Sequence, residues 1–254
     1  MNDKSVGVFR QASRGKPHPA YSPRPPPDRP LRLLILAVLA VAGCSQARPP
    51  EAPPDIPTGN ATGRTAMPPG VAVVSREAWG GAAPTRPMTP QTPRRLTIHH
   101  SATPQKPGES AGEILRPLLR FSLSSDTLGD GRPKQPWADV PYHFLIGPDG
   151  SIGEGRDVRF RGDSNTAYSL DGHLQVVVQG NFMEETPTPE QMASVTALAA
   201  ALTRQWRLDP ADLAGHRDHA VGQTSCPGDA LEARFPEIRA AMEAASEGSR
   251  GSVQ

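Results

Sequence analysis

Residues 95–100 read Arg-Leu-Thr-Ile-His-His and alternate apolar and polar residues, as a half-buried strand does. We expect Leu96 and Ile98 to face the core. A period of two then places Thr97 and His99 together on the opposite face of the strand. A buried strand that carries a histidine on its polar face can contribute that histidine to a functional site.

Further strands are predicted downstream of this one. Residues 142–147 read Tyr-His-Phe-Leu-Ile-Gly, and the turn signal Pro-Asp-Gly at 148–150 separates them from residues 151–154, which predicts a hairpin. Residues 174–179, Leu-Gln-Val-Val-Val-Gln, are apolar enough for a central strand of the sheet.

Helices are interleaved with these strands. Residues 109–123 carry apolar side chains at helical spacing, and Pro117 is expected to weaken or kink that helix. A second helix begins at Thr188, with proline next and Gln191 placed to close a capping box. A last helix is expected to run to about Ala245. The interleaving predicts an α/β fold, a single domain with a central mixed β-sheet flanked by helices.

The chain divides into four predicted segments. The globular domain is expected at 71–243, followed by a disordered tail at 244–254. Residues 44–70 hold seven of the 30 prolines and almost no large apolar residue, which predicts a disordered tether. Residues 1–43 are expected to be a lipoprotein signal peptide with a long basic n-region.

Charge is distributed unevenly over the 254 residues, although the formal net charge is only +1. Residues 1–32 hold seven Lys or Arg against two Asp, a net of +5, which leaves −4 for the remainder. A nucleic-acid-binding domain would present a basic face, so no nucleic-acid partner is expected.

The leader ends at a cysteine. Residues 33–43 are eleven uncharged residues, about 16 Å of helix, which is a signal-peptide h-region rather than a membrane span. Residues 41–44, Val-Ala-Gly-Cys, resemble a lipobox, and the resemblance implies cleavage before Cys44 and its acylation. An ordinary secretory signal with an incidental cysteine is the alternative. We therefore expect an exported bacterial lipoprotein, membrane-anchored through Cys44 and facing the cell wall from the periplasm or the outer surface.

Cysteine usage bears on the chemistry of the domain. The chain has only Cys44 and Cys226, and two cysteines in an exported protein ordinarily suggest a disulfide. If Cys44 is bonded to lipid, Cys226 has no such partner, and a metal bond best explains the lone thiol. His99, His216 and Cys226 would supply two imidazoles and a thiolate, a ligand set that suits zinc. Their spacing alone does not distinguish a metal site from surface histidines.

The domain resembles the zinc-dependent N-acetylmuramoyl-L-alanine amidase family, which includes phage-lysozyme-type amidases and peptidoglycan recognition proteins. The motifs that carry the resemblance occur in one order: Ser-Arg-Glu-Ala-Trp-Gly (75–80), Ile-His-His-Ser-Ala (98–102), Tyr-His-Phe-Leu-Ile-Gly (142–147), Gly-Asn-Phe (180–182), Gly-His-Arg-Asp (215–218) and Thr-Ser-Cys-Pro-Gly (224–228).

The resemblance implies a hydrolase that cleaves the amide between N-acetylmuramic acid and L-alanine, with peptidoglycan as its partner and one Zn²⁺ per chain as its cofactor. His99, His216 and Cys226 match the family's zinc ligands. Tyr142 and Thr224 match positions beside the metal, and we expect both to be catalytic. A phenol has a pKa near 10, so Tyr142 is expected to orient water or donate to the oxyanion rather than act as a base.

Three hypotheses for the activity remain open: this amidase, a non-catalytic binding protein, and a zinc hydrolase that acts on another amide. Relatives that bind peptidoglycan without cutting it commonly lack a ligand, notably the cysteine, and this chain keeps all three. A non-catalytic peptidoglycan-binding lipoprotein is nevertheless the alternative, because residues 161–165 depart from the common Gly-Ala-His pattern. Arg156 and Arg159 are candidate substrate-binding residues that could pair with stem-peptide carboxylates, with a solvated loop as the other interpretation. The chain is expected to act as a monomer.

Three further histidines are expected to have other roles. Alternation turns His100 away from His99, which predicts a packed or hydrogen-bonded ring. His143 is likewise expected to face away from Tyr142. His219 lies three residues from His216 and could compete for the metal, but the resemblance selects His216.

Overall fold

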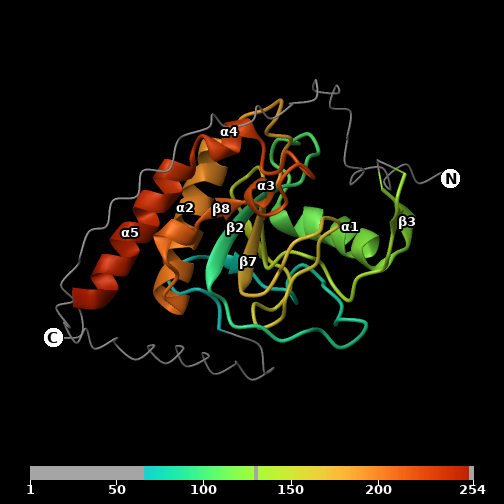
Figure 1. The fold of residues 1–254 in the computed structure, drawn as a ribbon, viewed down its shortest axis with the longest axis horizontal. Coiled ribbons are helices and arrows are strands. Elements are labelled where there is room, and N and C mark those ends of the chain that lie inside the picture. Colours follow the sequence, from blue (N-terminus) through green and yellow to red (C-terminus); the bar gives the residue numbers. More distant parts are fainter. Residues whose placement is uncertain (1–65, 129–130, 252–254) are drawn as a thin grey trace, which may run out of the picture. The chain divides into compact units, whose positions relative to one another are not determined.

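The computed structural model describes residues 66–128 and 131–251 (Figure 1). The strands are β1 (Val73–Val74), β2 (Arg95–His100), β3 (Asp126–Thr127), β4 (Pro133–Lys134), β5 (Phe144–Ile146), β6 (Ile152–Glu154), β7 (His173–Val178) and β8 (Ala214–Gly215). The helices are α1 (Ala111–Leu123), α2 (Pro189–Trp206), the 3-10 turn η2 (Pro210–Asp212), α3 (His216–His219), α4 (Asp229–Glu232) and α5 (Phe235–Gly251).

A six-stranded mixed sheet forms the centre of the domain, in the order β1-β6-β5-β7-β2-β8. The hairpin pair β5 and β6 is antiparallel, and every other pair in this sheet is parallel. β3 and β4 form a separate two-stranded sheet. The predicted α/β class, the hairpin and the central position of β7 are confirmed.

The register of β2 fixes which side chains share a face. Ile98 lies beside Val176 of β7, and His99 lies beside Val177. Leu96 and Ile98 are fully buried in the larger core cluster, as the alternation predicted. The opposite face of the same strand therefore carries Thr97 and His99.

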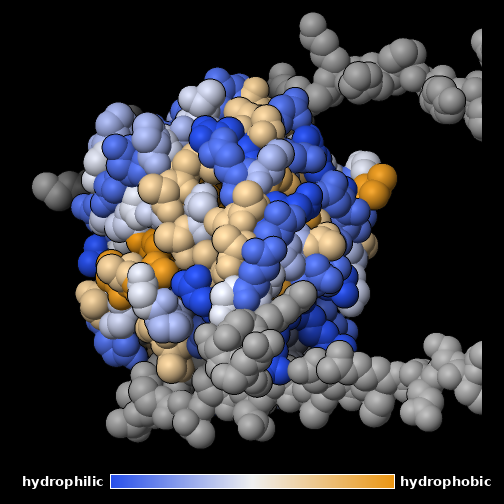
Figure 2. Space-filling view, turned by 90° about the vertical axis from the view of Figure 1, so that its left-hand side faces the viewer, coloured by the Kyte–Doolittle hydropathy of each residue, from blue (hydrophilic) through white to orange (hydrophobic). Residues whose placement is uncertain are grey.

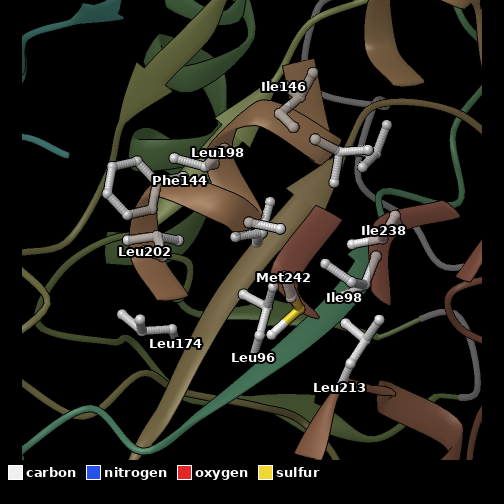
Figure 3. Close-up of a cluster of buried hydrophobic side chains, with 14 of the residues drawn as sticks. Leu96, Ile98, Phe144, Ile146, Leu174, Leu198, Leu202, Leu213, Ile238 and Met242 are labelled. Atoms are coloured by element: carbon white, nitrogen blue, oxygen red, sulfur yellow. The ribbon is translucent and has the colours of Figure 1, made fainter. Parts of the chain in front are cut away.

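The two faces of the sheet are covered differently (Figure 1). α2 and α5 pack together over the face that carries Ile98, where side chains from the sheet and both helices interdigitate (Figure 3). α1 covers part of the other face, where Leu115 packs against Val177 and Leu145. The part of that face that α1 does not cover carries Thr97 and His99.

Helix starts follow local chemistry. Thr188 caps α2, accepting a hydrogen bond from the Gln191 backbone N–H, while the Gln191 side chain returns one to Thr188, so the predicted capping box is confirmed. Ser110 and Glu113 form an equivalent box on α1, which the sequence reading did not identify. α1 continues through Pro117 to Leu123 as one helix.

The expected domain limits of 71 and 243 are both too narrow. The carbonyl of Ala66 accepts a hydrogen bond from Gln205 of α2, so residues before 71 contact the domain. α5 runs to Gly251, which makes residues 244–251 helical instead of a disordered tail. The physical reason is burial against α2: Met242 is fully buried and Ala245 is 5% exposed.

The predicted signal peptide, most of the tether and Cys44 lie outside the described residues. Within residues 66–128 and 131–251, no helix is both long and apolar enough to cross a membrane. The face on which α5 lies mixes hydrophilic and weakly hydrophobic residues, and strongly hydrophobic ones occur there only in small areas (Figure 2).

Candidate metal centre

Strand pairing brings the two predicted histidine ligands together. Ile98 of β2 is in register with Gly215 of β8, so the residues that follow them, His99 and His216, lie side by side. Their ring centroids are 4.6 Å apart. The ligand atoms of these two histidines and of Cys226 all lie within 4.8 Å of one another.

The loop that carries Cys226 is anchored against β2 and α3. The backbone N–H of Arg217 donates to the Cys226 carbonyl at 2.7 Å, and the backbone N–H of His100 lies 3.3 Å from the Cys226 sulfur. Sγ of Cys226 lies 3.7 Å from Nδ1 of His99. The Cys226 thiol is therefore held against the end of β2, where its sulfur contacts the His100 backbone N–H.

Burial sets the protonation of the group. It lowers the pKa of His99 well below its usual value, with His216 contributing next, and it lowers the pKa of His216 to about 4. Burial also raises the pKa of the Cys226 thiol to about 12. The imidazoles are therefore neutral at pH 7, with lone pairs available, and the thiol keeps its proton until a cation takes its place.

The donor set fits zinc. Two neutral imidazoles and a cysteine are a ligand combination found in catalytic zinc sites, which keep a fourth position for water or substrate. Nε2 of His99 is buried without a hydrogen-bond partner in the described residues, and its Nδ1 faces only the Cys226 sulfur. The ring of His99 is thus uncommitted to other protein groups and available to a metal.

A loop before β7 holds the second histidine in place. Nε2 of His216 lies 2.6 Å from Oγ1 of Thr166 and 3.4 Å from Oγ of Ser164. An Nε2–H that donates to Thr166 leaves Nδ1 free to bind a metal. The sequence reading missed both residues: it noted the departure at 161–165, but no spacing or motif connects that segment with His216.

The two predicted catalytic residues lie at the group. The ring of Tyr142 is 5.1 Å from that of His99, and burial, followed by the charges of Cys226 and Tyr168, raises the pKa of its phenol. Tyr142 therefore stays protonated and can donate a hydrogen bond. Oγ1 of Thr224 accepts from the Cys226 backbone N–H at 3.1 Å, which leaves its own O–H available to donate.

The three histidines that were expected to have other roles lie outside this group. Nδ1 of His100 accepts from the Phe182 backbone N–H at 3.3 Å, and His100 is buried, as predicted. His143 is also hydrogen-bonded in the interior: the Gln175 backbone N–H donates to its Nδ1 at 2.9 Å. His219 contacts Oγ1 of Thr97 at 3.5 Å instead of joining the group.

Arg156 and Arg159 differ in position. Arg156 is 2% exposed, and its guanidinium donates to the carbonyls of Val140 and Asp139 and to the Asp163 carboxylate. Contrary to the prediction, it is therefore not placed to bind a stem peptide. A buried guanidinium must keep such partners, because losing them would leave a charge uncompensated. Arg159 forms an ion pair with Asp157, and its substrate-binding role stays a prediction.

Comparison with known proteins places this geometry in a family. Peptidoglycan-recognition protein SD of Drosophila simulans is 29% identical over 167 residues, which cover 64% of this chain and 83% of that protein. The crystal structure of Drosophila peptidoglycan recognition protein SD matches with a TM-score of 0.55 at 29% identity, covering 64% of this chain and 92% of that one. The N-acetylmuramoyl-L-alanine amidase LysC of Clostridium intestinale matches with a TM-score of 0.50 at 26% identity, covering 68% and 97%.

The family model for N-acetylmuramoyl-L-alanine amidase (Amidase_2) matches residues 89–229. This range spans more than half of the chain and contains His99, Tyr142, His216, Thr224 and Cys226. The chain belongs to the N-acetylmuramoyl-L-alanine amidase family, whose members it resembles in both sequence and fold.

Proposed function

We propose that this chain is a zinc-dependent peptidoglycan hydrolase that cleaves the amide between N-acetylmuramic acid and L-alanine. The observation that carries the proposal is the compact group of His99, His216 and Cys226, buried on the polar face of the sheet within the matched family range. A binding domain has no need to keep three buried donors with so few other partners.

The residues of the site have different roles in the proposed amide hydrolysis. When bound, zinc supplies a Lewis acid for the carbonyl and lowers the pKa of a water. His99 and His216 would hold it through neutral imidazoles, and Cys226 would give up its proton to bind it as a thiolate. Tyr142, protonated throughout, donates a hydrogen bond to the carbonyl oxygen of the amide as negative charge develops there. Thr224, whose Oγ1 accepts from the Cys226 backbone N–H, can donate a second hydrogen bond through its own O–H.

Digestion of purified sacculi tests the proposal. The full chain with zinc should release peptides with a free N-terminal L-alanine, identified by mass spectrometry, and should contain one zinc per chain. Cys226→Ala should lose both the metal and the activity. Ser225→Ala, an exposed neighbour in the same loop, should keep both. A chain that holds zinc but releases no such peptide from sacculi of several chemotypes would contradict the proposal.

The second candidate is a protein that binds peptidoglycan without cutting it. It is favoured by the recognition proteins among the relatives and by the loop at 161–165, which departs from the common pattern. Sacculus binding that is as tight in Cys226→Ala as in the wild type, with no peptide release by either, would favour this candidate over the hydrolase.

Anchoring of the chain to a membrane is a separate proposal. It is supported by the lipobox-like residues 41–44 and by the proline-rich stretch that follows them. Labelled palmitate should be incorporated into the wild-type chain and not into Cys44→Ala. If both chains are labelled equally, Cys44 is not the attachment site. The monomeric state and the lack of a nucleic-acid partner stay predictions.

A further inference from the structure

The loop before β7 also places a second tyrosine, Tyr168, beside the metal group. The ring of Tyr168 lies 5.3 Å from the ring of His216. On its other sides it stacks on His219 at 5.8 Å and meets His173 edge-on at 5.5 Å. Oγ1 of Thr97 lies 2.8 Å from Nδ1 of His173 and ties this histidine to β2. The ring of Tyr168 is thus fixed by packing against three imidazoles.

The hydroxyl group of Tyr168 has no partner for its hydrogen bonds. Its oxygen is buried, yet no hydrogen bond reaches it from any residue in 66–128 or 131–251. Leaving a buried hydroxyl unpaired costs stability, and buried unpaired polar groups are rare in folded proteins. Such a group, held rigidly at the edge of a ligand site, is suited to bind something that the protein alone does not contain.

Ring contacts place Tyr168 and Tyr142 at neighbouring members of the metal group. The ring of Tyr168 lies 5.3 Å from that of His216, whose ring lies 4.6 Å from that of His99. The ring of Tyr142 lies 5.1 Å from the same His99 ring. The two phenol rings therefore contact adjacent ligands of the group, one from the segment before β5 and the other from the loop before β7.

We propose that Tyr168 is a further catalytic residue, whose hydroxyl donates a hydrogen bond to the carbonyl oxygen of the substrate amide. This inference rests on the proposed function. Two phenols in a buried site would stabilise the developing oxyanion better than Tyr142 alone, because pre-oriented donors need no reorganisation during the reaction. No proton is transferred in this step, since the hydroxyl only donates a hydrogen bond.

Two variants of Tyr168 separate its hydroxyl from its ring. Tyr168→Phe removes only the unpartnered hydroxyl, so the metal-free chain should unfold at the same temperature or a higher one. Tyr168→Leu also removes the packing against His219 and should unfold at a lower temperature. Ser169→Ala, an exposed neighbour, is the control and should behave as the wild type in every assay.

Activity and ligand binding are then measured on the full chain. With zinc, Tyr168→Phe should keep one metal per chain and a KM within threefold, while its kcat falls by about 10- to 100-fold, as expected for loss of an oxyanion donor. With cobalt in place of zinc, the affinity for acetohydroxamate, followed by visible absorption, should fall by about tenfold. A kcat and a hydroxamate affinity both within twofold of the wild type would overturn the proposal.

The two readouts keep this inference distinct from the proposed function. If the wild type cleaves no sacculus, the proposed function fails, but the hydroxamate affinity of the cobalt-loaded chain still reports on the Tyr168 donor. A tenfold loss in Tyr168→Phe would then support a ligand-binding hydroxyl. If Tyr168→Phe unfolds as early as Tyr168→Leu, the hydroxyl has a structural partner and the inference is wrong.

Discussion

Nε2 of His216 lies 2.6 Å from Oγ1 of Thr166. The two residues are 50 positions apart, and they meet because the loop before β7 folds back over the start of α3. When the Nε2–H of a histidine donates to such a partner, the lone pair is on Nδ1 and the ring orientation is fixed. Thr166 therefore prepares His216 to bind a metal through its other nitrogen.

Replacing Thr166 tests whether its hydroxyl orients His216 for metal binding. Thr166→Val keeps the shape of the side chain and removes its hydroxyl, so zinc affinity should fall by about 10- to 100-fold, as for other partners of metal-bound histidines. Competition with a fluorescent chelator measures the affinity. Thr127→Val, at an exposed threonine of β3, is the matched control and should bind zinc as the wild type does. Equal affinities in the two variants would mean that Thr166 does not orient His216.

Gly215 allows the Cys226 loop to lie close to His216. A Cβ atom at this position would lie 2.6 Å from Cδ of Pro227, next to Cys226. Gly215→Ala must therefore push the cysteine loop away from β8, at a cost of about 1–3 kcal/mol in the free energy of unfolding.

Zinc affinity should fall in Gly215→Ala as well, because His216 and Cys226 separate. Chemical unfolding with and without zinc measures both effects. The matched control is Gly248→Ala on α5, where an added Cβ meets nothing within 4 Å and should be neutral or stabilise by up to about 1 kcal/mol. Unchanged zinc binding in Gly215→Ala would show that the loop adapts without moving the ligand.

His143 makes the metal-free fold sensitive to acid. Burial lowers its pKa to about 4, while its Nδ1 accepts from the Gln175 backbone N–H, which requires the neutral ring. The unfolded chain takes up a proton near pH 6.5, so between these two values it binds more protons than the folded chain. Stability is therefore lost as the pH falls from about 6.5 to about 4.

The loss of unfolding free energy that His143 causes amounts to at most about 3 kcal/mol over that pH range. His143→Gln removes the titrating group, so the variant should lose less stability than the wild type between pH 7.5 and pH 4.5. Urea unfolding in the presence of a chelator measures the difference. The same loss of stability in both chains would show that His143 is not held neutral in the folded state.

Local patterns were sufficient to predict the frame of the site. The alternation of residues 95–100 placed Leu96 and Ile98 in the core and His99 on the other face, and the capping signal at Thr188 marked the start of α2. Both are short-range effects of backbone geometry, so they can be read without knowing what packs nearby. The order of the family motifs then identified Cys226 as the third member of the group.

Contacts from distant loops could not be predicted in this way. Thr166 and Tyr168 lie in a segment without hydrophobic periodicity, and their partners become neighbours only when the loop before β7 closes over the site. Arg156 was misjudged for a related reason. A charged side chain next to a turn usually faces solvent, but here the Asp163 carboxylate and backbone carbonyls satisfy it in the interior.

Tyr142 provides the sharpest test of how the site works. Its hydroxyl stays protonated because burial raises its pKa, so it acts as a donor and not as a base. Tyr142→Phe should keep one zinc per chain and lower kcat by about 100-fold on muropeptides. Because no proton leaves Tyr142 at any working pH, the pH profile of the residual activity should keep the shape of the wild-type profile. A variant whose profile loses its acidic limb would instead identify Tyr142 as the general base, because a base acts only when it is deprotonated.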